Sequence, residues 1–268
     1  MLPMRTIIIV FAASFLLAAC AGDGTVEELD RGSLIREGDI KLAAGDATAA
    51  SAFYEEALKR NPQDAQARAK LGDSKLALGQ AQAAVAQYRQ AVESSPSSRE
   101  ILVGYGRTAL KANDPDAAID AFQRAVLVEP TPQNYASLGA AYDLKGDHKN
   151  AQTAYRQGLR LAPQNLNLRN NMGLSLALGG DIEAGVNVLQ SVVIEPNATA
   201  QHRSNLALVY GLAGRENPAK RLLERDLTPA QVSRNLEIYR KMRGYNKRSL
   251  REAILVDNPD KLAQPGAQ

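Results

Sequence analysis

The sequence predicts an all-α protein built from a stack of about six similar helix pairs. Two ladders of residues support this prediction, and each runs through more than half of the chain. Prolines recur at intervals of 34, 34, 33 and 33 residues, at Pro62, Pro96, Pro130, Pro163 and Pro196. Glycines recur at a similar spacing, at Gly38, Gly72, Gly106, Gly139 and Gly173. Self-similarity at such a period is the signature of a solenoid of repeated units.

The residues between the ladders explain where each helix begins and ends. Seven residues after each ladder glycine stands a residue that tolerates the left-handed conformation and closes the first helix: Gly45, Gly79, Asn113, Gly146 and Gly180. The proline ends the second helix, because it lacks an N–H and clashes with the preceding turn. Between them the pattern A-x-x-x-[YF]-x-x-A places small and aromatic residues on one helical face, with Val188 replacing the ring in repeat five. One pair cannot bury this face alone, so neighbouring pairs stack.

The spacing predicts helix pairs near 32–44/47–60, 66–78/81–94, 100–112/116–128, 133–145/148–161, 167–179/182–194 and 201–213/217–226. Repeat four begins one residue early, and repeat five is expected to lose one residue in its inter-helix turn. A capping helix is predicted at 228–244, where Thr228 precedes Pro229 and an apolar stripe of Val232, Leu236 and Tyr239 follows.

This pattern resembles the tetratricopeptide repeat (TPR) over residues 31–227. The resemblance implies a right-handed superhelix whose first helices line a concave groove. At the position that often carries Trp in this family, three repeats have an arginine instead, at Arg68, Arg169 and Arg203. Their aliphatic stems are expected to cover that spot.

The N-terminus predicts export and a lipid anchor. Arg5 is followed by an uncharged stretch that is too short to span a bilayer, which needs about 20 apolar residues. Leu17-Ala18-Ala19-Cys20 resembles a bacterial lipobox, so residues 1–19 are expected to be a signal peptide and Cys20 to carry lipid. The alternative is an ordinary signal peptide with an incidental cysteine. Residues 20–30 would then be a tether, and 245–268 a flexible basic tail.

Charge and motifs argue against several functional classes. Removal of residues 1–19 takes away Arg5 alone, so the formal charge falls from 32 − 29 = +3 to 31 − 29 = +2, too weak for a general nucleic-acid binder. His148, at a turn, is expected to be a solvated surface residue, and His202 has no acidic pattern around it. No catalytic or metal-binding motif is present. We therefore expect no enzyme activity, no small-molecule substrate, no metal, and no cofactor other than the lipid on Cys20.

The TPR resemblance places two residues of each first helix in the groove, and these are the candidate binding residues: Arg36, Asp39, Lys70, Asp73, Arg107, Asn171, Leu174, Asn205 and Leu208. The pairs Arg36/Asp39 and Lys70/Asp73 are expected to form solvated i, i+3 contacts. The two asparagines have two interpretations. Each amide could read the backbone of an extended peptide, since it offers a donor and an acceptor, or it could bond neighbouring helices or water.

The basic run from Arg234 to Arg251 also has two interpretations. It carries seven Lys and Arg residues against Glu237 alone. Near a membrane tether it could contact anionic head groups, or it could be a solvated helix face and tail.

The lipobox, the repeats and the tail NLALVYGLAGRENPAKRLLERDLTPAQVSRNLEIYRKM together resemble the TadD-type TPR lipoproteins of tight-adherence (Tad/Flp) pilus assembly systems. That resemblance implies a protein anchored to the periplasmic face of the outer membrane, which binds the pilus secretin or other assembly proteins. Two alternatives stay open: a pilotin or adaptor for another secretin or for envelope hydrolases, and an accessory protein of polysaccharide export.

Overall fold

The computed structural model describes residues 30–245, 249 and 253–254, and this part of the chain forms thirteen α-helices with no strands. The all-α prediction is confirmed. The predicted signal peptide, Cys20, the tether as far as residue 29, and nearly all of the tail after Tyr245 lie outside the described residues.

Twelve helices form six consecutive pairs, and the thirteenth follows the last pair. The pairs are α1 (Arg31–Ala43) and α2 (Ala47–Arg60), α3 (Ala65–Ala77) and α4 (Ala81–Ser94), α5 (Arg99–Lys111) and α6 (Pro115–Val128), α7 (Pro132–Lys145) and α8 (His148–Leu161), α9 (Leu166–Gly179) and α10 (Ile182–Val193), and α11 (Ala200–Leu212) and α12 (Glu216–Leu223), before α13 (Pro229–Met242). Most predicted bounds agree with these within one or two residues; α12 is the exception.

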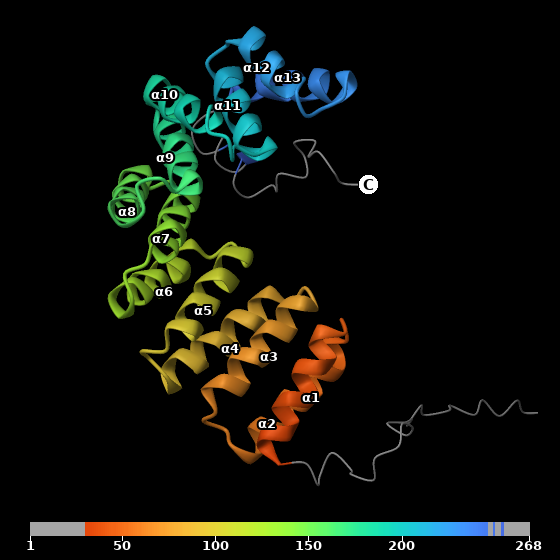
Figure 1. The fold of residues 1–268 in the computed structure, drawn as a ribbon. Helices are drawn as coiled ribbons and strands as arrows, with labels where there is room; N and C mark the ends of the chain where they lie inside the picture. Colours follow the sequence, from red (N-terminus) through yellow and green to blue (C-terminus); the bar gives the residue numbers. More distant parts are fainter. Residues whose placement is uncertain (1–29, 246–248, 250–252, 255–268) are drawn as a thin grey trace, which may run out of the picture.

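The pairs stack into a curved solenoid (Figure 1). Each helix packs against its partner in the pair and against the next helix along the chain. Each first helix also packs against the first helix of the next pair, from α1 on α3 to α9 on α11. Among the described residues, successive second helices do not pack against each other to a similar extent. The first helices therefore line the inner, tighter side of the curve, which is the side that forms the groove.

The first helices end where the sequence predicts a left-handed residue. Gly45, Gly79, Gly146 and Gly180 have φ values of 83°, 74°, 88° and 108°, and Asn113 takes the same role with φ 56°. This region of φ costs glycine little and asparagine less than most residues. An aspartate follows directly in four of the pairs and caps the second helix with its side chain, at Asp46, Asp114, Asp147 and Asp181.

The ladder glycines are needed because an aromatic ring of the same pair lies against their backbone. A Cβ atom at Gly38 would lie 2.4 Å from the Tyr54 ring, and one at Gly139 would lie 2.3 Å from the Tyr155 ring. Real Cβ atoms do not approach this closely, so the first helix can contact the second helix only where it has no side chain. The intermediate pairs use Gly72 with Tyr88 and Gly106 with Phe122 in the same way.

Repeat five departs from the expected register. Leu189, which is fully buried, takes the place of the ring beside Gly173, whereas Val188 is only half-buried. The prediction that Val188 fills this place was wrong. The turn between the helices keeps its length, and the missing residue lies instead at the end of α10, which stops at Val193. Packing therefore follows the distance from the inter-helix glycine and not the distance from Pro196.

The sixth pair is truncated by the chain that follows it. α12 ends at Leu223, three residues before the predicted end at 226. Asp226 turns back toward α11, where it accepts hydrogen bonds from Arg203 Nε and Nη2, both at 2.6 Å. Leu227 is buried, and Thr228 then caps α13 with Gln231 in a reciprocal capping box.

The terminal helix covers the last pair, as expected. Val232, Leu236 and Tyr239 are buried in the same hydrophobic cluster as α11 and α12, and the Tyr239 ring lies against Gly211. Two arginines of the predicted basic run are paired here, because Arg240 and Arg243 donate to Glu216 of α12. In the described part of the chain, no helix has both the length and the hydrophobicity needed to cross a bilayer.

Candidate functional site

The charged end of the groove contains ion pairs that differ from those predicted. Asp39 accepts hydrogen bonds from the Tyr54 hydroxyl at 2.7 Å and from Lys70 Nζ of the next repeat at 2.6 Å. Arg36, expected to pair with Asp39, is exposed and donates to Ser33 instead. Lys70 thus links two repeats, where a contact with Asp73 on its own helix was predicted. The prediction was wrong because stacking of the repeats brings Asp39, 31 residues away along the chain, within hydrogen-bond distance of Lys70.

The same arrangement recurs one repeat later. Asp73 accepts a 2.6 Å hydrogen bond from the Tyr88 hydroxyl. Burial first, and then the bond to Asp73, raise the pKa of Tyr88 far above its usual value, so this hydroxyl remains a donor at neutral pH. Arg107 lies exposed on the next first helix, and its charge acts on the same hydroxyl in the opposite direction.

A polar hollow of 690 Å³ opens beside these residues, between repeats one to three. Lys70 and Asp73 line it together with Asp64 and Ser98 of the inter-repeat loops and Glu100 of the first turn of α5. The hollow carries charges of both signs, so it suits a polar segment of another protein better than an apolar one.

The asparagine end of the groove is a chain of amide hydrogen bonds between α9 and α11. Asn205 Nδ2 donates to Asn170 Oδ1 at 3.0 Å, and Asn170 Nδ2 donates to Asn171 Oδ1 at 3.2 Å. Gln201 completes the chain by donating to Asn205 Oδ1 at 2.9 Å. Asn205 is buried and uses both sides of its amide within the protein, which is the second interpretation given above. Asn171 is half-buried, and its amino group has no partner among the described residues.

The two leucines of the candidate set lie in different surroundings. Leu208 is 2% exposed and belongs to the core cluster that α13 covers. The prediction that it offers apolar contact in the groove is therefore wrong. Leu174 is only partly buried and packs at the edge of the same cluster, so it stays available beside Asn171.

His148 was expected on the surface, and the structure places it in a buried polar cluster. Its Nδ1 atom lies 2.8 Å from Oδ1 of Asp143, which is buried. The same carboxylate accepts hydrogen bonds from the Ser175 hydroxyl at 2.6 Å and from the Tyr155 hydroxyl at 2.9 Å. The cluster joins repeats four and five. Sequence reasoning missed it because Asp143 lies four residues past the ladder glycine, a position that holds leucine in repeats one and two.

His202 is buried at the start of α11, where it caps the helix. Its Nδ1 accepts the N–H of Thr199, so Nε2 carries the ring proton and donates to Asn167 Oδ1 at 3.2 Å. Burial, followed by the positive charge of Arg203, lowers the pKa of His202. The ring is therefore a neutral structural group of repeat six. Among the described residues, no group of three or more His, Cys, Asp and Glu side chains could hold a metal ion.

Comparison with known proteins agrees with this geometry. Residues 35–74, 69–135 and 132–165 match models of the tetratricopeptide repeat. The fold is a TPR superhelix. A stack of this kind is a scaffold for protein–protein interactions and presents an extended concave binding surface. No functionally curated protein matches the sequence.

Three solved structures show how far the likeness extends. A tetratricopeptide repeat protein from Parabacteroides merdae ATCC 43184 is 17% identical, with a TM-score of 0.69 over 85% of this chain and 99% of that one. PilW, described as a widely conserved type IV pilus biogenesis factor, is 20% identical, with a TM-score of 0.62 over 78% and 97%. MamA is 25% identical, with a TM-score of 0.56 over 61% and 90%. The first two, both below 25% identity, show the fold alone.

Proposed function

We propose that this protein is a scaffold of envelope assembly, tethered to the outer membrane by lipid on Cys20, and that its concave groove holds an extended segment of a Tad/Flp pilus assembly protein. The observation that carries the proposal is the groove itself, which is charged at one end and has an amide at the other. The lipobox and the tail motif support the pilus assignment, through their resemblance to TadD-type lipoproteins. The protein has no catalytic role in this proposal.

The two ends of the groove would hold different parts of the partner. Arg36, Arg107 and the Lys70–Asp39 pair offer charges to polar side chains. Among the described residues, the Arg107 side chain has no hydrogen-bond or ion-pair partner, whereas Arg36 donates to Ser33 and its charge also acts on Asp30. Asn171 offers its amino group to a peptide carbonyl, and Leu174 lies one helical turn away for an apolar neighbour. Losing such a bond in a shielded groove costs roughly 1–3 kcal/mol, because the opposing group loses its partner.

Binding of the purified pilus secretin to the full chain would test the groove. Asn171→Ala combined with Arg107→Glu should weaken this interaction at least about tenfold and leave the thermal midpoint nearly unchanged. Arg156→Glu is the matched control, since Arg156 is exposed on the second helix α8 and bonds only Thr153. Equal affinity of the double variant and the control would contradict the groove as the binding site.

The anchor requires a separate experiment. Cys20→Ala should leave the protein unprocessed or move it out of the membrane fraction, because the acyl chains supply the membrane affinity. If the variant has the mature size and fractionates with the outer membrane like the wild type, the lipid anchor is refuted.

A further inference from the structure

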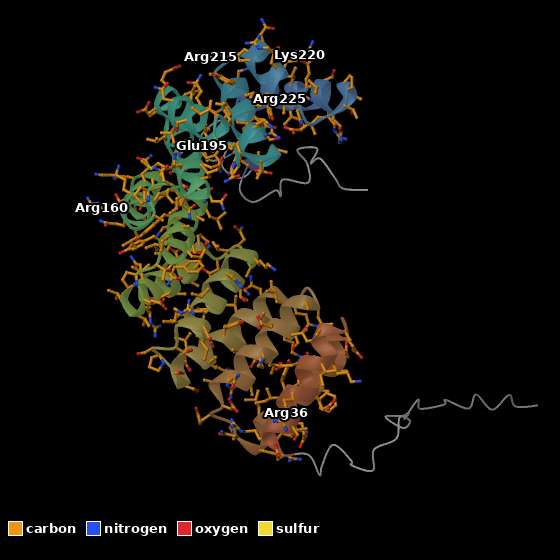
Figure 2. All side chains as sticks on the ribbon, viewed as in Figure 1. Arg36, Arg160, Glu195, Arg215, Lys220 and Arg225 are labelled. Atoms are coloured by element: carbon orange, nitrogen blue, oxygen red, sulfur yellow. The ribbon has the colours of Figure 1, made fainter. Side chains whose placement is uncertain are left out.

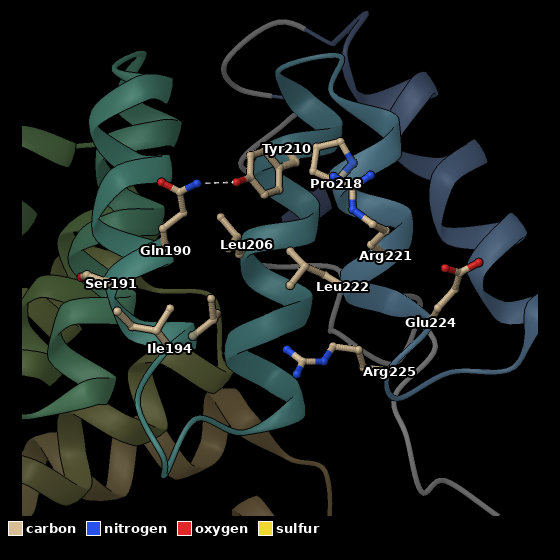
Figure 3. Close-up of a pocket in the computed structure, with 11 residues that line it drawn as sticks. Gln190, Ser191, Ile194, Leu206, Tyr210, Pro218, Arg221, Leu222, Glu224 and Arg225 are labelled. Carbon is tan, nitrogen blue, oxygen red and sulfur yellow. Dashed lines mark hydrogen bonds between the residues drawn. The ribbon is translucent and has the colours of Figure 1, made fainter.

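A second hollow lies on the outer side of the last repeats, away from the concave groove. It has a volume of 770 Å³ and opens between α10 and α12, with α11 as its floor (Figure 3). Its lining is mainly apolar and includes Val193; Ile194 and Leu222 lie on opposite sides of it, with Leu206 between them. Ile194 is 80% exposed and lies beside the other apolar residues of the lining, so it is part of an apolar patch and not an isolated surface residue.

The hollow exists because two successive second helices are short. The second helices of the first four pairs each have 14 residues, whereas α10 has 12 and α12 has 8. The bond between Arg203 and Asp226 draws the chain back to α11 at the point where α12 would otherwise continue. The side chains that the last turns would have covered are therefore left uncovered.

The floor of the hollow needs no polar partner. Gln190 Nε2 of the α10 wall donates to the hydroxyl of Tyr210 on the α11 floor at 2.7 Å, so these two polar groups are partnered with each other (Figure 3). An occupant gains most there by burying an apolar side chain.

The rim of the hollow is positively charged. Arg221 on α12 and Arg225, two residues past the end of that helix, both lie along its edge, and the guanidinium of Arg225 extends toward the Ile194 side (Figure 3). Among the residues that the structure describes, neither arginine has a hydrogen-bond or ion-pair partner. Glu224, the one carboxylate of the rim, lies 3.6 Å from Lys220 Nζ, which offsets its charge. Figure 2 shows Arg225 and Arg36 at opposite ends of the stack, far from each other.

We propose that this hollow is a second docking site, distinct from the groove, for an acidic segment of a partner protein with one bulky apolar side chain. The apolar side chain would occupy the space between Ile194 and Leu222. Carboxylates on either side of it would pair with Arg221 and Arg225, whose planar guanidinium groups bind carboxylates in two-point contacts. An apolar anchor in a pocket, with a polar rim around it, is a common arrangement in protein–protein interfaces.

Fluorescence anisotropy with the full chain would test the site. The probe is a short fluorescein-labelled peptide with a central phenylalanine flanked by glutamates, in a glycine–serine background. We expect saturable binding that weakens as salt is raised, because exposed charge pairs are screened. A peptide with lysines in place of the glutamates should not bind.

Matched variants locate the binding. Arg225→Glu and Ile194→Ser should each weaken peptide binding at least about tenfold. The controls lie one repeat earlier, where Arg160 and Leu161 end α8 and are also exposed. Arg160→Glu and Leu161→Ser should leave binding unchanged, as should the groove variant Asn171→Ala. Because that variant belongs to the proposed function, the two proposals stand or fall separately.

Three results would overturn the proposal. The first is an absence of saturable binding up to about 1 mM peptide, a very weak affinity for any specific site. The second is equal loss of binding in the pocket variants and their controls. The third is a clear gain in peptide affinity on deletion of residues 255–268, which would identify the chain's own tail, and not a partner, as the occupant.

Discussion

Repeats one and four share a tyrosine–aspartate bond, but its surroundings differ at the two places. In repeat one, the Tyr54 hydroxyl bonds Asp39, whose side chain is 44% exposed and also holds Lys70. In repeat four, the Tyr155 hydroxyl bonds Asp143, whose side chain is 7% exposed and serves Ser175 and His148 as well. The first bond lies in a solvated groove, whereas the second is buried and belongs to a cluster that holds repeats four and five together.

The difference separates the molecule into a regular end and an irregular end. The first three repeats keep one register, and each packs an aromatic ring against its ladder glycine. From repeat four onward the departures enter the packing: Leu189 replaces a ring, several asparagines and His202 are buried, and α12 ends early. At the regular end, the candidate binding residues are therefore charged side chains on repeats that pack in the same way. At the irregular end, the candidate binding features arise because the packing itself differs.

The largest effect should come from removing the buried carboxylate. Asp143→Ala should lower the free energy of unfolding by about 2–4 kcal/mol, because several buried donors lose their acceptor. Asp39→Ala should cost less than about 1 kcal/mol, since water can replace a half-exposed partner. Both changes gain the same helix propensity, so chemical denaturation of the two variants compares the surroundings directly. Equal losses would refute the distinction between the two ends.

A medium effect is expected at the ladder glycines. Gly139→Ala should destabilise by about 1–3 kcal/mol, because the new methyl group meets the Tyr155 ring, which Asp143 holds in place. Gly38→Ala should cost less, since Tyr54 is tied to a more exposed aspartate and can shift. Gly32→Ala is the control: its Cβ would meet the ends of the exposed Asp30 and Arg36 side chains, at 3.2 and 3.5 Å, and should be nearly neutral. Thermal unfolding of the three variants would rank them.

The smallest effect concerns pH at the irregular end. Because burial lowers the pKa of His202, the ring stays neutral in the native state while the unfolded chain takes up a proton below its ordinary value of about 6.5. Stability due to this group is thus complete above that pH and is lost as the pH falls below it. One proton limits the slope to about 1.4 kcal/mol per pH unit.

His202→Gln isolates this contribution. Glutamine can accept the Thr199 N–H as histidine does, and it does not titrate. Denaturation between pH 7.5 and pH 5 (about 1 unit above and about 1.5 units below the ordinary value of histidine) should therefore show a flatter pH dependence for the variant than for the wild type. Parallel curves for the two proteins would show that His202 does not titrate on unfolding.

The candidate site was only partly predictable. The positions of Asp39, Lys70, Asp73 and Arg107 on the first helices followed from the repeat, but the partners of Lys70 and Asp39 did not, because they lie in adjacent repeats. Leu208 occupies a groove position by count and is nevertheless buried, since α13 covers that part of α11. Buried polar clusters are harder still to predict: nothing in the local sequence indicates that Asp143 meets both Ser175 and His148.

The sequence by itself determined the all-α stack, most helix boundaries and the glycine–ring contacts, because these depend on residues within a single repeat. Turn glycines, capping aspartates and prolines act locally, so their spacing is enough. Only the tertiary structure decided the register of α10, the early end of α12 and the hollow beside Ile194. Each of these results from contacts between residues far apart along the chain, such as Arg203 with Asp226, whose distances depend on how the helices pack.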